Sequence, residues 1–203
     1  MLEGLVASAV VLFFIFDPFA SLPIFISLTK DQDQAQMIKS ANRAVIVAAL
    51  LFVVFALVGE DILALFGISI SSFRVAGGLV LMMMAIEVIF GIEISKHKNE
   101  DVAWVVIATP ILTGPGVIAT AILLVDQYDV VTVLLAGGFA LFITWLALHN
   151  SVYIVKKLGR NAIEIFSRII GLIIAALAVE YILSGTMEYI QQNMPDLILN
   201  FLP

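Results

Sequence analysis

Residues 17–23 read DPFASLP, and residues 109–115 read TPILTGP. In each stretch two prolines stand five positions apart, with a hydroxyl side chain between them. Both stretches lie inside apolar runs long enough to cross a membrane, which takes about 20 residues. Because proline lacks a backbone N–H and clashes with the preceding turn, each stretch predicts a helix broken near mid-membrane. Broken helices at matching places in two halves of a chain are typical of the substrate site of a secondary transporter.

The composition places the chain among polytopic membrane proteins. Of its 203 residues, 62% are hydrophobic and 13% are charged, whereas soluble domains average about 45–50% apolar and about 25% charged residues. Residues 102–125 contain no charged side chain at all. The net charge of −6 argues against a nucleic-acid partner. The absence of cysteine excludes disulfides and thiolate metal sites.

Six apolar runs have the length of a membrane-spanning helix. They cover roughly residues 4–28, 42–65, 73–95, 102–125, 130–152 and 166–190. None of them alternates with a period of two, so a β-barrel pattern is absent and helices are expected. The sequence therefore predicts an all-α membrane protein with six transmembrane helices in a single domain, residues 1–203, with the first and fourth helices broken.

The basic residues outside the apolar runs predict the orientation in the membrane. Eight of the ten Lys and Arg residues fall in the loops after the first, third and fifth predicted spans: Lys30, Lys39, Arg43, Lys96, Lys98, Lys156, Lys157 and Arg160. By the positive-inside rule these loops are cytoplasmic and both termini lie outside. No basic residue precedes the first apolar run, so a cleaved signal peptide is not expected. The expected location is the cell membrane, as a multi-pass protein of the inner or plasma membrane.

The two halves of the chain align with each other at an offset of about 92 residues. The two Pro-rich stretches then align without a gap, Arg74 falls near Arg168, and Glu87 falls near Glu180. Each half holds three predicted spans, so the second half enters the membrane from the opposite side. We therefore expect residues 1–98 and 99–203 to be two inverted three-helix repeats related by an axis in the membrane plane.

The Pro-rich stretches carry the groups that a small zwitterion needs. Broken helices free backbone carbonyls, which suit an ammonium group, and expose helix N-termini, which suit a carboxylate. The predicted substrate-binding residues are Asp17, Pro18, Ser21, Pro23, Thr109, Pro110, Thr113, Gly114, Pro115 and Gly116. A plain proline kink is the alternative interpretation of either stretch taken alone.

Five ionisable side chains in the apolar runs leave alternatives open. Asp17 either binds an ammonium, a coupling cation or a proton, or caps the helix that starts at Pro18. Glu87 and Glu180 either couple transport to protons or extend toward the far interface. Arg74 and Arg168 are expected to form structural ion pairs, because a cation at a helix start opposes the helix dipole.

Three further stretches resemble the MarC family of integral membrane proteins. They are FGISISSFRVAGGL at 66–79, PILTGPGVI at 110–118 and AIEIFSRIIGL at 162–172. The resemblance covers nearly the whole chain and implies a six-helix inner-membrane protein whose relatives include transporters of glycine, alanine and similar amino acids. Family members often carry Asn at the position of Asp17 and can carry Gln at that of Glu180, which implies a polar ligand or cap rather than a universal proton carrier.

The function expected from the sequence is secondary transport of small neutral amino acids by alternating access. A proton or sodium gradient would drive it, since no ATP-binding motif is present, and no other cofactor or metal is expected. The alternatives are an exporter or channel for other small solutes, including drugs, or a membrane scaffold or sensor that transports nothing. An enzyme is not expected, because no H-E-x-x-H motif occurs. The predicted partners are the amino acid and the lipid bilayer.

Overall fold

The computed structural model describes residues 2–91 and 114–194, and all regular structure in these two segments is helical. In chain order the helices are α1 (Leu2–Phe16), α2 (Pro18–Leu28), α3 (Gln34–Leu65), α4 (Ile70–Phe90), α6 (Pro115–Gln127), α7 (Val130–His149), α8 (Ser151–Leu158) and α9 (Arg160–Asn193). The prediction of an all-helical membrane protein is therefore confirmed.

Within the described segments five helical stretches are long and apolar enough to cross a membrane. They are Leu2–Leu28, Gln34–Leu65, Ile70–Phe90, Val130–His149 and Arg160–Asn193. Helix α6 is a shorter apolar helix of 13 residues. It forms the second part of the predicted fourth span, and the first part of that span, residues 102–113, lies outside the described residues.

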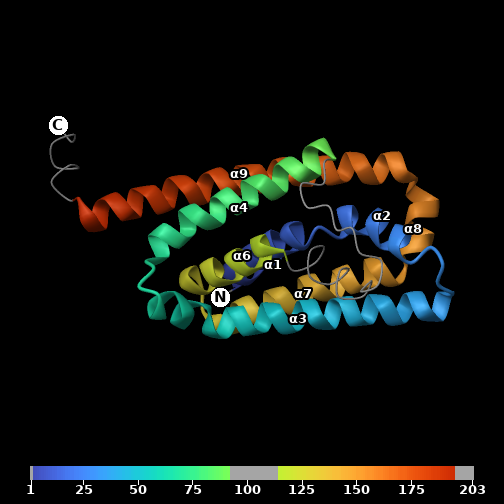
Figure 1. Ribbon diagram of the computed structural model, residues 1–203, viewed down its shortest axis with the longest axis horizontal. Coiled ribbons are helices and arrows are strands. Elements are labelled where there is room, and N and C mark those ends of the chain that lie inside the picture. The colour runs from blue at the N-terminus through green and yellow to red at the C-terminus, as the bar shows by residue number, and fades with distance from the viewer. Residues whose placement is uncertain (1, 92–113, 195–203) are drawn as a thin grey trace.

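The helices form three groups in Figure 1. Helices α4 and α9 lie side by side along one side, α3 and α7 lie side by side along the other, and α1, α2 and α6 lie between the two pairs. Helices of the central group contact both pairs: α1 packs on α7, and α6 packs on α3 and on α4. The short half-helices are therefore held at the centre of the bundle.

Contacts near the helix ends fix the helix directions. Gly4, at the start of α1, lies against the ring of Tyr128, just after the end of α6. Because α1 and α6 pack together, they run antiparallel. Near the start of α4, Arg74 pairs with Asp126 near the end of α6, so these two helices are antiparallel as well.

Small residues let the helices of each outer pair approach closely. Helices α3 and α7 meet where the Phe52 ring covers Gly137, and a Cβ on that glycine would lie 2.2 Å from a ring atom. Helices α4 and α9 meet at Gly78, where a Cβ would lie 2.7 Å from the carbonyl oxygen of Ala178. Between apolar helices in lipid, such close packing replaces the hydrophobic effect as the source of association.

Large apolar side chains cover the outside of the bundle. Leu57, Leu135, Leu172 and Leu183 are 55–62% exposed, from α3, α7 and α9. Exposed apolar patches of this extent do not occur on soluble monomers and mark a membrane surface.

Several predicted span boundaries differ from the observed helix ends. The predicted third span, 73–95, corresponds to α4, which begins at Ile70 and ends at Phe90 before its C-cap Gly91. Helix α3 begins at Gln34, well before predicted residue 42, because Asp33 and Gln36 form a capping box with bonds of 2.8 and 3.1 Å. Helix α9 extends the predicted span 166–190 at both ends. The predicted fifth span, 130–152, is interrupted at Asn150, after which α8 forms a separate helix.

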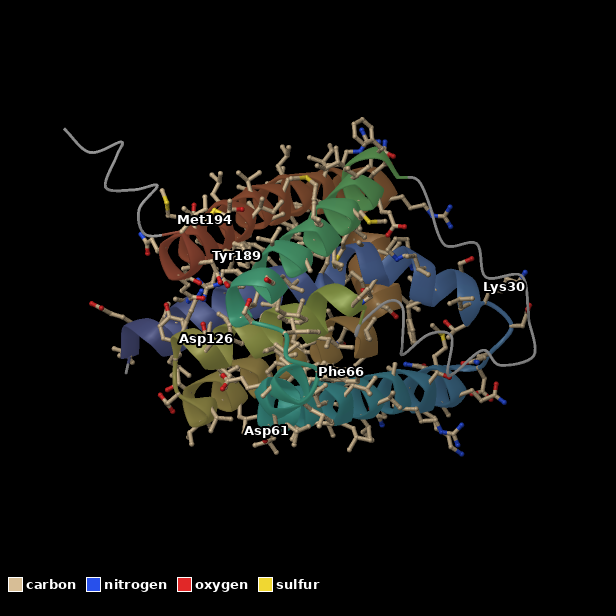
Figure 2. All side chains as sticks on the ribbon, turned by 60° about the vertical axis from the view of Figure 1, so that its left-hand side comes forward. Lys30, Asp61, Phe66, Asp126, Tyr189 and Met194 are labelled. Carbon is tan, nitrogen blue, oxygen red and sulfur yellow. The ribbon has the colours of Figure 1, made fainter. Side chains whose placement is uncertain are left out.

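The two ends of the bundle carry opposite charge. Figure 2 places Lys30 at one end and Asp61, Asp126 and Tyr189 at the other. Helix α8, with Lys156 and Lys157 in its last turn, packs on α2 and α9 at the Lys30 end. The bundle thus has a basic end and an acidic end.

Candidate functional site

The first span breaks at Asp17, between α1 and α2. Asp17 has φ 36° and ψ 71°, and it is the one residue other than glycine with positive φ in the described segments. Aspartate tolerates this left-handed conformation better than most residues, although it costs about 1–3 kcal/mol. Pro18 follows as the first residue of α2, and a residue before proline avoids the right-handed helical region. The DP pair therefore produces the break.

The Asp17 side chain has two different oxygens. Oδ1 accepts a hydrogen bond of 3.1 Å from the Ala20 N–H and so caps α2. Oδ2 is buried and has no hydrogen-bond partner in the described part of the chain. Only 3% of the residue is exposed. Asp17 thus serves as the helix cap, one of its two expected roles, while its second oxygen remains free for a ligand.

The other residues of DPFASLP divide between the interior and the surface. Ser21 is buried, and its hydroxyl donates a hydrogen bond of 2.9 Å to the Asp17 carbonyl oxygen. Pro18 is buried at the break. Pro23 lies inside α2 with its side chain exposed. Pro23 therefore bends the helix from outside and does not face the break.

The second Pro-rich stretch is described from Gly114 onward, and Thr109, Pro110 and Thr113 lie outside the described residues. Helix α6 begins at Pro115, and its N-cap Gly114 offers no side-chain cap. Gly116 is buried, and a Cβ there would lie 3.0 Å from Leu81 of α4. The start of α6 is therefore an uncapped helix N-terminus in close contact with α4.

The two breaks lie at the same depth. Asp17 is 13 residues after Gly4, and Gly114 is 14 residues before Tyr128, the partner of Gly4. Each distance is about 20 Å along a helix. Because α1 and α6 are antiparallel, α2 and α6 start near the middle of the bundle and run toward opposite ends.

Arg74 joins three helices near the acidic end. From α4, its guanidinium pairs with Asp126 of α6 at 2.7 Å and with Glu188 of α9. The Arg74 side chain is 7% exposed, and the two acids are 31% and 38% exposed. A buried cation needs such partners. We refer to these three residues as the arginine clamp.

Arg168, Glu87 and Glu180 differ from this arrangement. Arg168 is exposed and pairs with Glu164 at 2.5 Å, one turn earlier in the same helix. Glu87 is half-buried on α4. Glu180 is exposed on α9 and lines a cavity of about 290 Å³ between α1, α4, α6 and α9. The structure thus gives Arg168 a partner in its own helix and places Glu180 at this cavity.

Two cavities lined by residues of the described segments lie toward the acidic end. One is the cavity of about 290 Å³, whose lining includes Arg74, Glu180 and Tyr181. The other, of about 390 Å³, is lined by Glu3, Tyr128 and Asp129 among others. Ala7 and Tyr128 line both cavities. No cluster of three metal-ligating side chains occurs in residues 2–91 and 114–194.

Residues 2–190 match the MarC family, described as the MarC family of integral membrane proteins. The match spans nearly the whole chain. The chain belongs to the MarC family. This confirms the resemblance carried by the FRVAGGL, TGPGVI and SRIIGL stretches.

Relatives of the MarC protein come from archaea and bacteria. A UPF0056 membrane protein of Archaeoglobus fulgidus is 36% identical over 195 residues, covering 90% of this chain and 92% of the relative. One from Methanocaldococcus jannaschii is 35% identical over 187 residues, covering 86% and 91%. The UPF0056 inner membrane protein YhgN of Escherichia coli K12 is 31% identical over 194 residues, covering 91% and 96%. No solved structure matches the chain significantly.

Several polar residues of this MarC protein carry no linear motif and were not predicted. Asp126 and Glu188 lie 52 and 114 positions from their partner Arg74. Ser8 and Thr120 are buried hydroxyl residues whose oxygens have no partner in the described segments. The one sequence feature that could have indicated these acids was Arg74 itself, because a cation at the start of a helix opposes the helix dipole and needs a partner.

Proposed function

We propose that this MarC-family protein is a secondary transporter for small neutral amino acids of the glycine, alanine and serine class. It works by alternating access across the inner or plasma membrane, driven by a proton or sodium gradient. The substrate binds at mid-membrane between the start of α2 and the start of α6.

One observation carries the proposal: two half-helices start at the same depth and run toward opposite ends of the bundle. Asp17 supplies a buried carboxylate oxygen with no partner in the described segments. The start of α6 supplies the Gly116 N–H and the positive end of the helix dipole, since Pro115 has no N–H and the Val117 N–H donates to the Gly114 carbonyl oxygen. These two groups match the ammonium and the carboxylate of an amino acid.

Burial supports two inverted three-helix repeats, residues 1–98 and 99–203. Five buried positions of α3 correspond to five buried positions of α7 at a constant offset of 92 residues. They are Ala41 and Val133, Ala44 and Ala136, Ala48 and Ala140, Phe52 and Thr144, and Ala56 and Leu148. Because α3 and α7 also pack on each other, the same face of each helix is used in one shared interface.

Contacts between α4 and α9 support the same symmetry. Gly78 lies against Ala178 and Ile182, while Gly171 lies against Ala85 and Ile89. Each residue of the second set is 93 positions from its counterpart in the first. A reciprocal exchange of this kind is the mark of a two-fold axis through the interface. Movement of one repeat against the other would open the site to each side in turn.

The charged ends support the orientation of the protein. Basic residues gather at the end where α2 finishes and α9 begins, and acidic residues gather at the other. By the positive-inside rule the basic end is cytoplasmic. Helix α1 begins at the acidic end, so the N-terminus lies outside. After the even number of spans the C-terminus lies outside as well.

Uptake of labelled glycine and alanine into proteoliposomes tests the function. We expect uptake that depends on a proton or sodium gradient and is competed by unlabelled alanine. No uptake or exchange under either gradient would rule transport of these substrates out.

Asp17 variants test the site. Asp17→Asn retains a capping oxygen and loses the charge, so we expect an intact fold with KM raised about tenfold, as for the loss of a charged hydrogen bond. Asp17→Ala loses the cap and the ligand oxygen, and uptake should fall to background. Asp129→Ala is the matched control, because Asp129 caps α7 in the same way from outside the site. Equal uptake by Asp17→Ala and Asp129→Ala would remove Asp17 from the substrate site.

A further inference from the structure

Three buried side-chain oxygens have no hydrogen-bond partner in the described segments: Ser8 Oγ, Thr120 Oγ1 and Asp17 Oδ2. Ser8 and Thr120 are both 0% exposed. The neighbouring case of Thr144 is different, because its equally buried hydroxyl donates to the Ala140 carbonyl oxygen at 2.9 Å. A buried polar atom without a partner costs free energy and is uncommon in native proteins. Three of them therefore need an explanation.

The three oxygens come from two helices that pack on each other. Ser8 is on α1, Asp17 ends α1, and Thr120 is on α6, which packs on α1. Measured from the Gly4–Tyr128 contact, Ser8 lies about 6 Å, Thr120 about 12 Å and Asp17 about 20 Å deep, at 1.5 Å per residue. They thus follow one another toward mid-membrane in steps of about 6–8 Å. We call this interface the α1–α6 seam.

The seam begins at the cavity of about 290 Å³ near the acidic end. Ala7 and Val11 of α1 and Leu124 of α6 line this cavity. Ser8 is the chain neighbour of Ala7, and Thr120 is one helical turn before Leu124. The cavity therefore lies beside the outer end of the seam.

The opposite wall of the cavity is polar and carries an excess of negative charge. Glu180 and Tyr181 line it, and neither side chain has a hydrogen-bond partner in the described segments. Arg74 also lines it, but Asp126 and Glu188 already balance its charge. A mouth with surplus carboxylates and apolar side walls concentrates cations.

We propose that the α1–α6 seam is the extracytoplasmic half of the translocation path for a small solute with an ammonium group. The solute enters through the cavity at Glu180 and Tyr181 and passes the Ser8 and Thr120 oxygens to reach Asp17. The unpartnered oxygens then serve as successive acceptors for the ammonium group or for the water that accompanies it. This path rests on the proposed transport function, and it assigns residues that the two breaks do not include.

Cysteine accessibility tests the path, and the chain suits it because it contains no cysteine. Ser8→Cys and Thr120→Cys are read against Thr144→Cys, a hydroxyl of equal burial in the α3–α7 interface. A cationic, membrane-impermeant methanethiosulfonate reagent is added from the outside of whole cells. We expect both seam cysteines to react at least about tenfold faster than the control, whose exposure requires local unfolding. An anionic reagent of the same size should react about tenfold more slowly than the cationic one at both seam positions.

Equal labelling of Thr120→Cys and Thr144→Cys would overturn the path, and so would a preference for the anionic reagent. Alanine should protect both seam cysteines, whereas propionate, which lacks the ammonium group, should not. Protection by propionate equal to that by alanine would contradict the ammonium assignment. Melting temperatures equal to that of the parent protein confirm that each cysteine variant is folded.

A second measurement separates a path from a structural role. Thr120→Val removes a hydroxyl that has no partner, so the variant should melt at or above the parent temperature while its KM for uptake from outside rises severalfold. Thr144→Val loses a satisfied hydrogen bond, so it should melt lower with KM unchanged. Unchanged KM for Thr120→Val would remove Thr120 from the path.

Labelling and uptake can fail independently. If the seam cysteines are labelled but no amino acid is taken up, the aqueous path is supported and the proposed substrate is wrong. If amino acids are taken up but the seam cysteines react as slowly as the control, the proposed transport function is supported and the proposed path is wrong.

Discussion

Arg74 and Arg168 occupy aligned places in the two halves of the chain, yet their surroundings differ completely. Arg74 is buried and joins α4, α6 and α9 through two acids. Arg168 is half-exposed and pairs with Glu164 in its own helix. The residue of α9 whose burial matches that of Arg74 is Ser167, 93 positions on. The acidic end is therefore fastened by an ionic clamp across helices, and the basic end has no counterpart at Arg168.

The helices of the two ends are therefore held together by different kinds of ion pair, across helices at the acidic end and within one helix at Arg168. The clamp ties the half-helix α6, whose start forms part of the candidate site, to α4 and α9. At the basic end the other half-helix, α2, has no such ion pair, since residues 18–28 contain no charged side chain. The symmetry of the buried apolar positions thus coexists with an asymmetry of charge, and the two can be perturbed separately.

The largest expected effect is that of removing the clamp. Arg74→Ala leaves Asp126 and Glu188 beside each other without their cation, which should destabilise the protein by about 3 kcal/mol, the lower end of the range for broken buried pairs, because both acids are partly exposed. Arg168→Ala should cost less than about 0.5 kcal/mol, as expected of an exposed pair one turn apart. Denaturant unfolding in detergent measures both values. Similar losses for the two variants would mean that Arg168 also has a cross-helix role.

An intermediate effect is expected at the glycines of the α4–α9 interface. A Cβ on Gly78 would lie 2.7 Å from the Ala178 carbonyl oxygen, which belongs to rigid backbone. Gly78→Ala should therefore separate the helices at a cost of about 1–3 kcal/mol. Gly138→Ala is the matched control, because a Cβ there meets nothing within 4 Å. The proposed symmetry predicts a loss for Gly171→Ala as well, smaller because a Cβ there would meet the Ile89 side chain at 2.8 Å and the Ala85 carbonyl oxygen only at 3.4 Å. No loss at Gly171 would contradict the proposed correspondence between the halves.

The smallest effect concerns the exposed cap of α7. The Thr132 hydroxyl and N–H donate to the Asp129 carboxylate and lower its pKa below the usual value of 3.8. A carboxyl with a lowered pKa in the folded state contributes stability above its unfolded pKa. That contribution is lost as the pH falls through the folded value, so it should fade below about pH 4. Asp129→Asn should reduce this part of the pH dependence of the melting temperature while leaving the clamp and the seam untouched. If the pH dependence of the melting temperature is the same in Asp129→Asn and the parent protein, the cap on α7 is not formed in the membrane.

The sequence was sufficient for the class of fold, for the break at Asp17 and for the helix start at Pro115, because all three depend on local chemistry. Hydrophobic length predicts spans, and a DP pair predicts a broken helix. Helix ends were predicted less accurately. The first turns of α3 were not predicted because residues 34–41 include the polar residues Gln34, Gln36, Lys39 and Ser40, although the Asp33–Gln36 capping box stabilises a helix there.

The clamp and the seam could not be predicted, because they depend on which helix faces meet. In the sequence, Asp126 is an acid at the end of an apolar run, and no neighbouring residue indicates that it pairs with Arg74. Ser8 and Thr120 read as ordinary small polar residues of membrane helices. Both Arg74 and Arg168 form ion pairs, as expected, but their alignment did not show that only Arg74 pairs with acids of other helices.

Helix length has a consequence for the lipid. Helix α4 has 21 residues and α9 has 34, which correspond to about 32 Å and about 51 Å. The hydrocarbon of a typical bilayer is about 30 Å thick. Helix α9 is longer than the hydrocarbon layer and can span a thicker bilayer by tilting less, but α4 has no length to spare between its caps, Ser69 and Gly91. Bilayer thickness therefore acts first on α4, because a thicker membrane would draw its polar caps into hydrocarbon. The lipid chain length in which the protein is reconstituted thus becomes a variable of its activity.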